Sequence, residues 1–88
     1  MKNQLTGHEF QFSYDDNGRR PQLSVHADQR YIVEQLLGAL KADFICEDMF
    51  MNPQGKVTVV RFEFSDRYAE VLQRLLHELP DVRVPAPT

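Results

Sequence analysis

The sequence contains few of the residues that most often carry chemistry. Of its 88 residues one is cysteine, three are histidine and four are glycine, and tryptophan is absent. A single cysteine cannot form an internal disulfide, and the isolated glycines do not form a phosphate-binding loop. No histidine has a second histidine, cysteine or carboxylate at a spacing typical of a metal site. We therefore expect no metal, no cofactor and no catalytic residue, so the protein is not expected to be an enzyme.

A basic excess and a long apolar run are also absent. Ten Lys and Arg face thirteen Asp and Glu, which gives a net charge of −3, and the two signs alternate along the chain. Binding to nucleic acid phosphates needs a basic surface, which this pattern does not provide. Residues 1–10 lack the apolar core of a signal peptide, and no apolar run approaches the roughly 20 residues of a membrane span. We expect a cytoplasmic protein with no nucleic acid and no membrane partner.

The composition is nevertheless that of a folded protein. Hydrophobic residues make up 42% and charged residues 26% of the chain, which separates it from disordered sequences. A chain of this length forms one domain with a small core. We expect residues 1–80 to form a single α+β domain and residues 81–88 to form a Pro-rich C-terminal tail.

Two segments predict helices. Apolar residues recur at helical spacing from about residue 28 to residue 42, after Asp28 as a candidate N-cap. The same spacing recurs after Ser65 or Asp66 and ends at Pro80, which cannot continue a helix. Each helix has one broad apolar face, so each is expected to cover a sheet.

The segment from residue 8 to residue 27 predicts a β-hairpin. Apolar and polar residues alternate on both sides of Asn17-Gly18, a dipeptide typical of a type I′ turn. This turn places Phe12 opposite Leu23 on the core face. It also predicts further cross-strand neighbours, namely Phe10 with Val25, Glu9 with His26, and Asp15 with Arg20.

Residues 44–64 predict a second hairpin. Pro53 and Gly55 favour a type I turn followed by a left-handed residue, which places Asn52 opposite Lys56. In this register one face is the core face and carries Phe44, Cys46, Asp48, Phe50, Thr58, Val60, Phe62 and Phe64. The other face carries Ile45, Met49, Met51, Val57 and Val59, with Glu47 opposite Arg61 and with Glu63.

The order hairpin, helix, hairpin, helix predicts a two-layer α+β sandwich, ββαββα. A four-stranded antiparallel sheet would carry two helices on one face. If residues 22–27 and 56–64 are central neighbours, the sheet is a circularly permuted ferredoxin-like one. The sequence leaves open an intertwined dimer in which the hairpins pair between chains.

The apolar outer face of the second hairpin carries the functional prediction, because the chain's own helices can cover only one face of the sheet. We expect a small interaction module that forms a homodimer, binds another protein, or does both. The predicted interface is Ile45, Met49, Met51, Val57, Val59, Glu47 and Arg61.

Three alternatives to this interface remain. The tail could cover the patch, or its side chains could simply be exposed. A small-molecule-sensing domain, ACT-like by analogy of fold only, is another alternative, as is a small enzyme.

Overall fold

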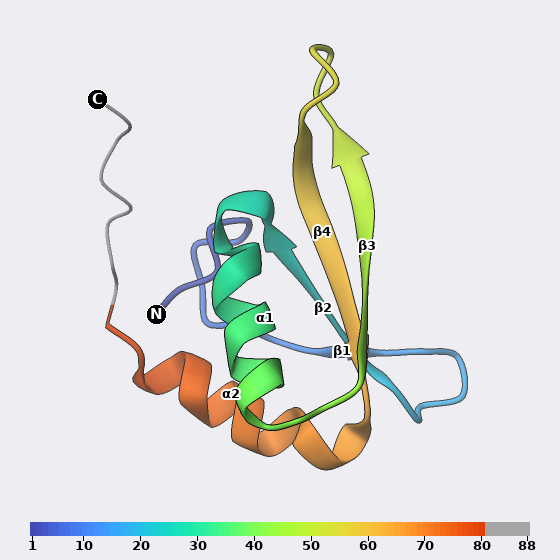
Figure 1. Cartoon of the computed structure of the whole chain (residues 1–88), viewed down its shortest axis with the longest axis vertical. Coiled ribbons are helices and arrows are strands. Elements are labelled where there is room, and N and C mark those ends of the chain that lie inside the picture. The colour runs from blue at the N-terminus through green and yellow to red at the C-terminus, as the bar shows by residue number, and fades with distance from the viewer. Residues whose placement is uncertain (81–88) are drawn as a thin grey trace.

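The computed structural model describes residues 1–80, and the predicted tail, residues 81–88, lies outside the described residues (Figure 1). The strands are β1 (Ser13–Tyr14), β2 (Pro21–His26), β3 (Phe44–Met51) and β4 (Val57–Phe64). The helices are α1 (Arg30–Ala39) and α2 (Ala69–Glu78), each preceded by a 3-10 turn, η1 (Ala27–Gln29) and η2 (Asp66–Tyr68). The predicted ββαββα order is confirmed.

The four strands form one antiparallel sheet in the order β1-β2-β4-β3. Strands β2 and β4 are therefore the central neighbours, as the circularly permuted ferredoxin-like arrangement requires. The two hairpins pair within one chain. Strands β1 and β3 are the two edges of the sheet.

The core lies between the sheet and the two helices, which lie on one side of the sheet in Figure 1. Strand β4 contributes Val60, Phe62 and Phe64, all without exposed surface. The other fully buried Leu and Val side chains come from β2 and from the inward faces of the helices, namely Leu23, Val25, Val33, Leu37, Leu72 and Leu76. The amphipathic spacing of both helices thus predicted their buried faces.

The first hairpin has the predicted register but a different turn. Ser13 pairs with Gln22 and Tyr14 with Pro21, which continues the predicted alignment. Gly18 has a φ of 65° and donates its N–H to the carbonyl of Asp15 at 2.9 Å, whereas Asn17 does not adopt a positive φ. The loop is therefore longer by one residue on each side than the predicted type I′ turn. The register survives because equal lengthening on both sides leaves the strand alignment unchanged.

Strand β1 is much shorter than predicted, because residues 8–12 leave β2. Phe10 is 2% exposed, and its carbonyl accepts a hydrogen bond from the Gln73 side chain of α2 at 3.2 Å. The predicted pairing of Phe10 with Val25 is therefore wrong. Glu9 contacts His77 at 3.0 Å, so its predicted pairing with His26 is wrong as well.

The Arg20 side chain also differs from its predicted position. Asp15 and Arg20 do face each other, since the Asp15 N–H donates to the Arg20 carbonyl at 3.2 Å. The Arg20 guanidinium instead lies 2.8 Å from a carboxylate oxygen of Glu63 on β4.

Candidate functional site

The β3–β4 hairpin projects beyond the rest of the domain, and its turn is the farthest point of the molecule from α2 in Figure 1. The turn is the predicted one. The Asn52 N–H donates to the Lys56 carbonyl at 2.8 Å, and Gly55 has a φ of 81°. Strand β3 has eight residues and lies at the edge of the sheet, so the hairpin presents an edge, a turn and two faces.

Exposed large apolar side chains concentrate on β3. Among residues 1–80 there are seven such side chains, and four of them belong to this strand. Their exposed fractions are 52% for Ile45, 36% for Met49, 64% for Phe50 and 62% for Met51. The other three lie on different elements, so β3 carries the main exposed apolar surface of the described chain.

The predicted pairing along the hairpin holds from Phe44 to Asp48 and then shifts. Asp48 pairs with Val60, but Phe50 pairs with Val59 and Met51 with Val57. An extra residue on β3 is followed by an extra residue on β4, so the two shifts cancel before the turn. Such bulges kink the strand and change the side-chain alternation locally.

This shift corrects three predicted face assignments, those of Phe50, Val57 and Met51. Directly paired residues share a face, so Phe50 lies with Val59 on the open face, meaning the face not covered by the helices. Phe50 was predicted on the core face. Val57 was predicted on the open face, yet it is half-buried and packs against the core. Its partner Met51 shares that side but remains exposed.

Polar side chains occupy the middle of the open face. Glu47 and Arg61 form the predicted pair, with an oxygen-to-nitrogen distance of 3.1 Å. Glu63 follows on the same face, where it contacts Arg20 at 2.8 Å and accepts a hydrogen bond from Gln22 at 3.4 Å. Of the seven residues predicted as an interface, Val57 and Met51 lie on the helix-bearing side, so the seven do not share one face. The apolar surface instead follows the β3 edge toward the turn.

Cys46 and Asp48 complete the helix-bearing side of β3. Cys46 is partly buried beside the core, and desolvation raises the pKa of its thiol, although the positive charge of Arg30 acts in the opposite direction. A raised pKa keeps the thiol protonated near neutral pH. Asp48 lies on the predicted helix-bearing side, opposite Val60, and is exposed there, 3.8 Å from the Arg30 guanidinium. Asp48 and Arg30 thus place a charged pair between the apolar residues at the two ends of β3.

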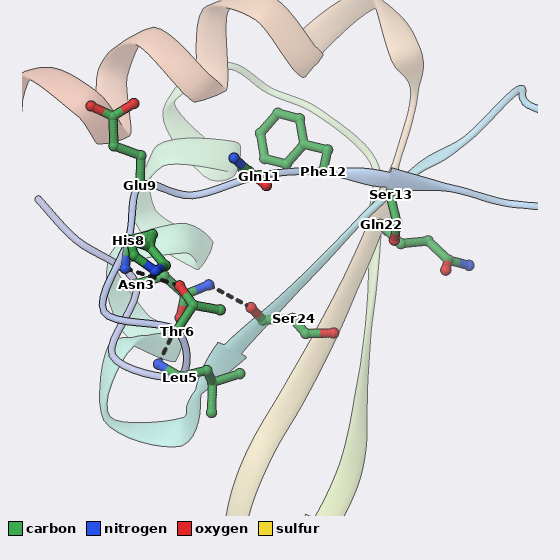
Figure 2. Close-up of a pocket in the computed structure, with 10 residues that line it drawn as sticks. All are labelled: Asn3, Leu5, Thr6, His8, Glu9, Gln11, Phe12, Ser13, Gln22 and Ser24. Carbon is green, nitrogen blue, oxygen red and sulfur yellow. Dashed lines mark hydrogen bonds between the residues drawn. The ribbon is translucent and has the colours of Figure 1, made fainter.

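A separate cavity of about 420 Å³ lies between residues 3–13 and β2 (Figure 2). Asn3 spans one side of it: its side-chain amide donates to the Ser24 carbonyl at 2.9 Å, and its side-chain oxygen accepts from the Leu5 N–H at 2.9 Å. Asn3 is buried, as is Gln29. The cavity is the gap that opens where residues 8–12 leave β2.

Gln29 fixes the same N-terminal segment from the other side. Its side-chain oxygen accepts from the Gln4 N–H at 2.9 Å, and its amide donates to the Lys2 carbonyl at 2.8 Å. Two buried amides thus hold residues 2–5 against β2 and η1. Sequence analysis missed both, because neither Asn nor Gln at these positions interrupts a periodic pattern.

Two further properties of residues 1–80 bear on the site. They contain no group of three or more His, Cys, Asp or Glu side chains arranged to hold a metal ion. No helix within the same residues has the length and apolar character needed to cross a membrane. Comparison with protein-family models, curated proteins and solved structures finds no significant match.

Proposed function

We propose that this chain is a small non-catalytic protein-interaction module that binds through the edge and open face of the β3–β4 hairpin. The concentration of exposed large apolar side chains on β3 carries the proposal. Burying one such side chain contributes about 1.5–3 kcal/mol, so Ile45, Phe50 and Met51 together could support specific binding.

The position of these side chains also supports binding. Among residues 1–80, strand β3 pairs with β4 on one side and with no strand on its other side. A strand in this position presents unpaired N–H and C=O groups that can bond to a further strand, while its side chains give specificity. Backbone and apolar contacts are therefore available on the same eight residues.

The acidic residues in the middle of β3 restrict which strand can bind. Glu47 and Asp48 lie between Ile45 and the apolar residues near the turn. Charged side chains on an edge strand oppose indiscriminate pairing, since a strand with acidic residues opposite them would be repelled. The edge thus combines an apolar attraction with a charge pattern that selects the partner.

Photo-crosslinking tests this function without assuming the partner. A benzoylphenylalanine replaces Phe50 in cells that express the protein, and a matched control replaces Tyr31, which is 50% exposed on α1. Irradiation should give a covalent protein adduct from position 50 and none from position 31. The Met49→Glu substitution should remove the adduct. Equal adducts from both positions, or none from position 50, would overturn the proposal.

A further inference from the structure

The outward backbone groups of β3 follow from the pairing of the sheet. The Ser24 carbonyl accepts from Asn3, so Ser24 directs its backbone groups away from β4. Arg61, opposite Ser24, therefore directs its groups toward β3, and its partner Glu47 directs its groups back toward β4. Alternation then leaves the N–H and C=O groups of Phe44, Cys46 and Asp48 pointing out from the sheet.

The charges of β3 restrict how two copies of this strand could pair antiparallel about a twofold axis. A pairing centred at Glu47 or at Asp48 places two identical carboxylates opposite each other. A pairing centred at Ile45 places Asp43 opposite Glu47 of the second copy. Like charges directly opposite each other destabilise a strand pair, so these three registers are disfavoured.

A pairing centred at Cys46 avoids every such contact. Asp48 then lies opposite Phe44 of the second copy, and Glu47 lies opposite Ile45 of the second copy. Each outward residue also meets an outward residue, so Phe44, Cys46 and Asp48 can all form hydrogen bonds between the copies. This register satisfies both the charges and the backbone groups of the edge.

The same register accounts for the projecting end of the hairpin. Residues 49–51 would lie beside residues 41–43 of the second copy, at the base of its own β3. The exposed Phe50 and Met51 would thus be covered by the segment between α1 and β3 of the second copy. In this register each copy brings the exposed apolar end of its β3 beside the segment that precedes β3 in the other copy.

We infer that the partner of the β3 edge is a second copy of this chain, paired antiparallel about Cys46. This inference rests on the proposed function and names its partner. The twofold axis is perpendicular to the sheet, so two four-stranded sheets join into one of eight strands with all helices on the same face.

Engineered disulfides test the register. In the inferred dimer, Ile45 and Glu47 of the second copy form a pair without backbone hydrogen bonds, with Cα atoms about 4.5 Å apart, a distance that a disulfide can span. Two proteins are made in a Cys46→Ser background, one with Ile45→Cys and one with Glu47→Cys. They are mixed and treated with diamide, which accepts the two electrons and two protons released as two thiols form one disulfide.

The mixture should give a dimer linked between position 45 of one copy and position 47 of the other, identified by mass spectrometry. Each protein alone should give little linked product. Linkage of the Ile45→Cys protein alone would indicate a centre at Ile45, and linkage of the Glu47→Cys protein alone would indicate a centre at Glu47. Either result would overturn the register inferred from the charges.

A proline tests the backbone pairing. Asp48→Pro removes an N–H that points away from β4, so β3 keeps its bonds to β4 while the dimer loses two N–H donors, one in each copy. The control Asp48→Ala keeps the N–H. Light scattering over a dilution series should show roughly 10- to 100-fold weaker dimerisation for Asp48→Pro than for Asp48→Ala. Equal dimerisation of the two variants, with circular dichroism showing both folded, would overturn the inference.

The photo-crosslinking experiment separates this inference from the proposed function. A monomer in light scattering whose position 50 links to a different cellular protein overturns the second copy as partner and leaves the interaction module in place. A monomer without any adduct from position 50 overturns both.

Discussion

The two edges of the sheet differ in how their backbone groups are covered. At one edge β1 has only two residues, and the rest of β2 is covered by the N-terminal segment, with Asn3 bonded to the Ser24 carbonyl. At the other edge β3 runs for eight residues, and no strand within residues 1–80 pairs with its outer side. One edge is satisfied by the chain itself, and the other is the edge at which we propose that a partner binds.

The difference shows two ways to protect a sheet edge. A buried amide can supply the missing hydrogen bond, as Asn3 does, at the cost of ordering a loop around it. Alternatively, charges and a bulge can limit which strand pairs there, as Glu47, Asp48 and the register shift near Phe50 do on β3. The first way satisfies the backbone groups of an edge, and the second limits which strands can pair with it.

The largest expected effect comes from β4, a central strand of the sheet. Phe62 on β4 is fully buried, so Phe62→Ala should lower the free energy of unfolding by roughly 3–5 kcal/mol, the usual cost of emptying a large buried site. Urea denaturation followed by circular dichroism measures this loss. A loss below about 1 kcal/mol would mean that the core does not depend on the centre of the sheet.

Asn3→Ala should destabilise the β1 edge of the sheet, where the N-terminal segment covers β2. This substitution leaves the Ser24 carbonyl and the Leu5 N–H without the side chain that bonds to them. A buried group left unpaired costs about 1–3 kcal/mol, and less where a water molecule takes the place of the lost partner. We expect a loss of roughly 1–3 kcal/mol and faster amide hydrogen exchange in residues 3–8. Gln4→Ala, at an exposed side chain, is the control. Equal exchange in both variants would show that Asn3 does not close this edge.

A stabilising substitution is expected in the segment just before β3. Lys41 lies between α1 and β3 with a φ of 57°, a left-handed conformation that glycine adopts more readily. Lys41→Gly should raise the free energy of unfolding by about 0.5–1 kcal/mol, measured by thermal denaturation. Ala39→Gly, inside α1, is the control and should destabilise. A destabilised Lys41→Gly protein would contradict the left-handed helix end.

The smallest effect on stability is expected at the exposed end of β3, near the turn. Phe50 is mostly exposed, so Phe50→Glu should change the free energy of unfolding by no more than about 0.5 kcal/mol. The same change should weaken association, because it introduces a charge into the apolar end of β3. Denaturation combined with sedimentation velocity measures both. Strong destabilisation would place Phe50 in the core and contradict the register shift.

Much of the fold could be predicted because its signals are local. Helical spacing predicted α1 and α2 and their buried faces, and the residues of each turn predicted two hairpins and their alignment. The Glu47–Arg61 pair was predicted in the same way, since it follows from the alignment that Asn52 and Gly55 impose. On the hairpin of the candidate site, the sequence predicted three of the four exposed large apolar residues and missed Phe50.

What the sequence alone determined is therefore which segments become helices and strands, in which order, and which side of each is mainly apolar. Only the tertiary structure decided three further features. Phe10 enters the core, and Gln73 of α2 bonds to its carbonyl, so residues 8–12 leave β2. Asn3 reaches a carbonyl 21 residues away, and paired bulges move Phe50 to the open face. The first two features depend on contacts between distant segments, whose free energies outweigh local alternation and leave no periodic signal in the sequence. The bulges accompany the packing of Val57 against the core.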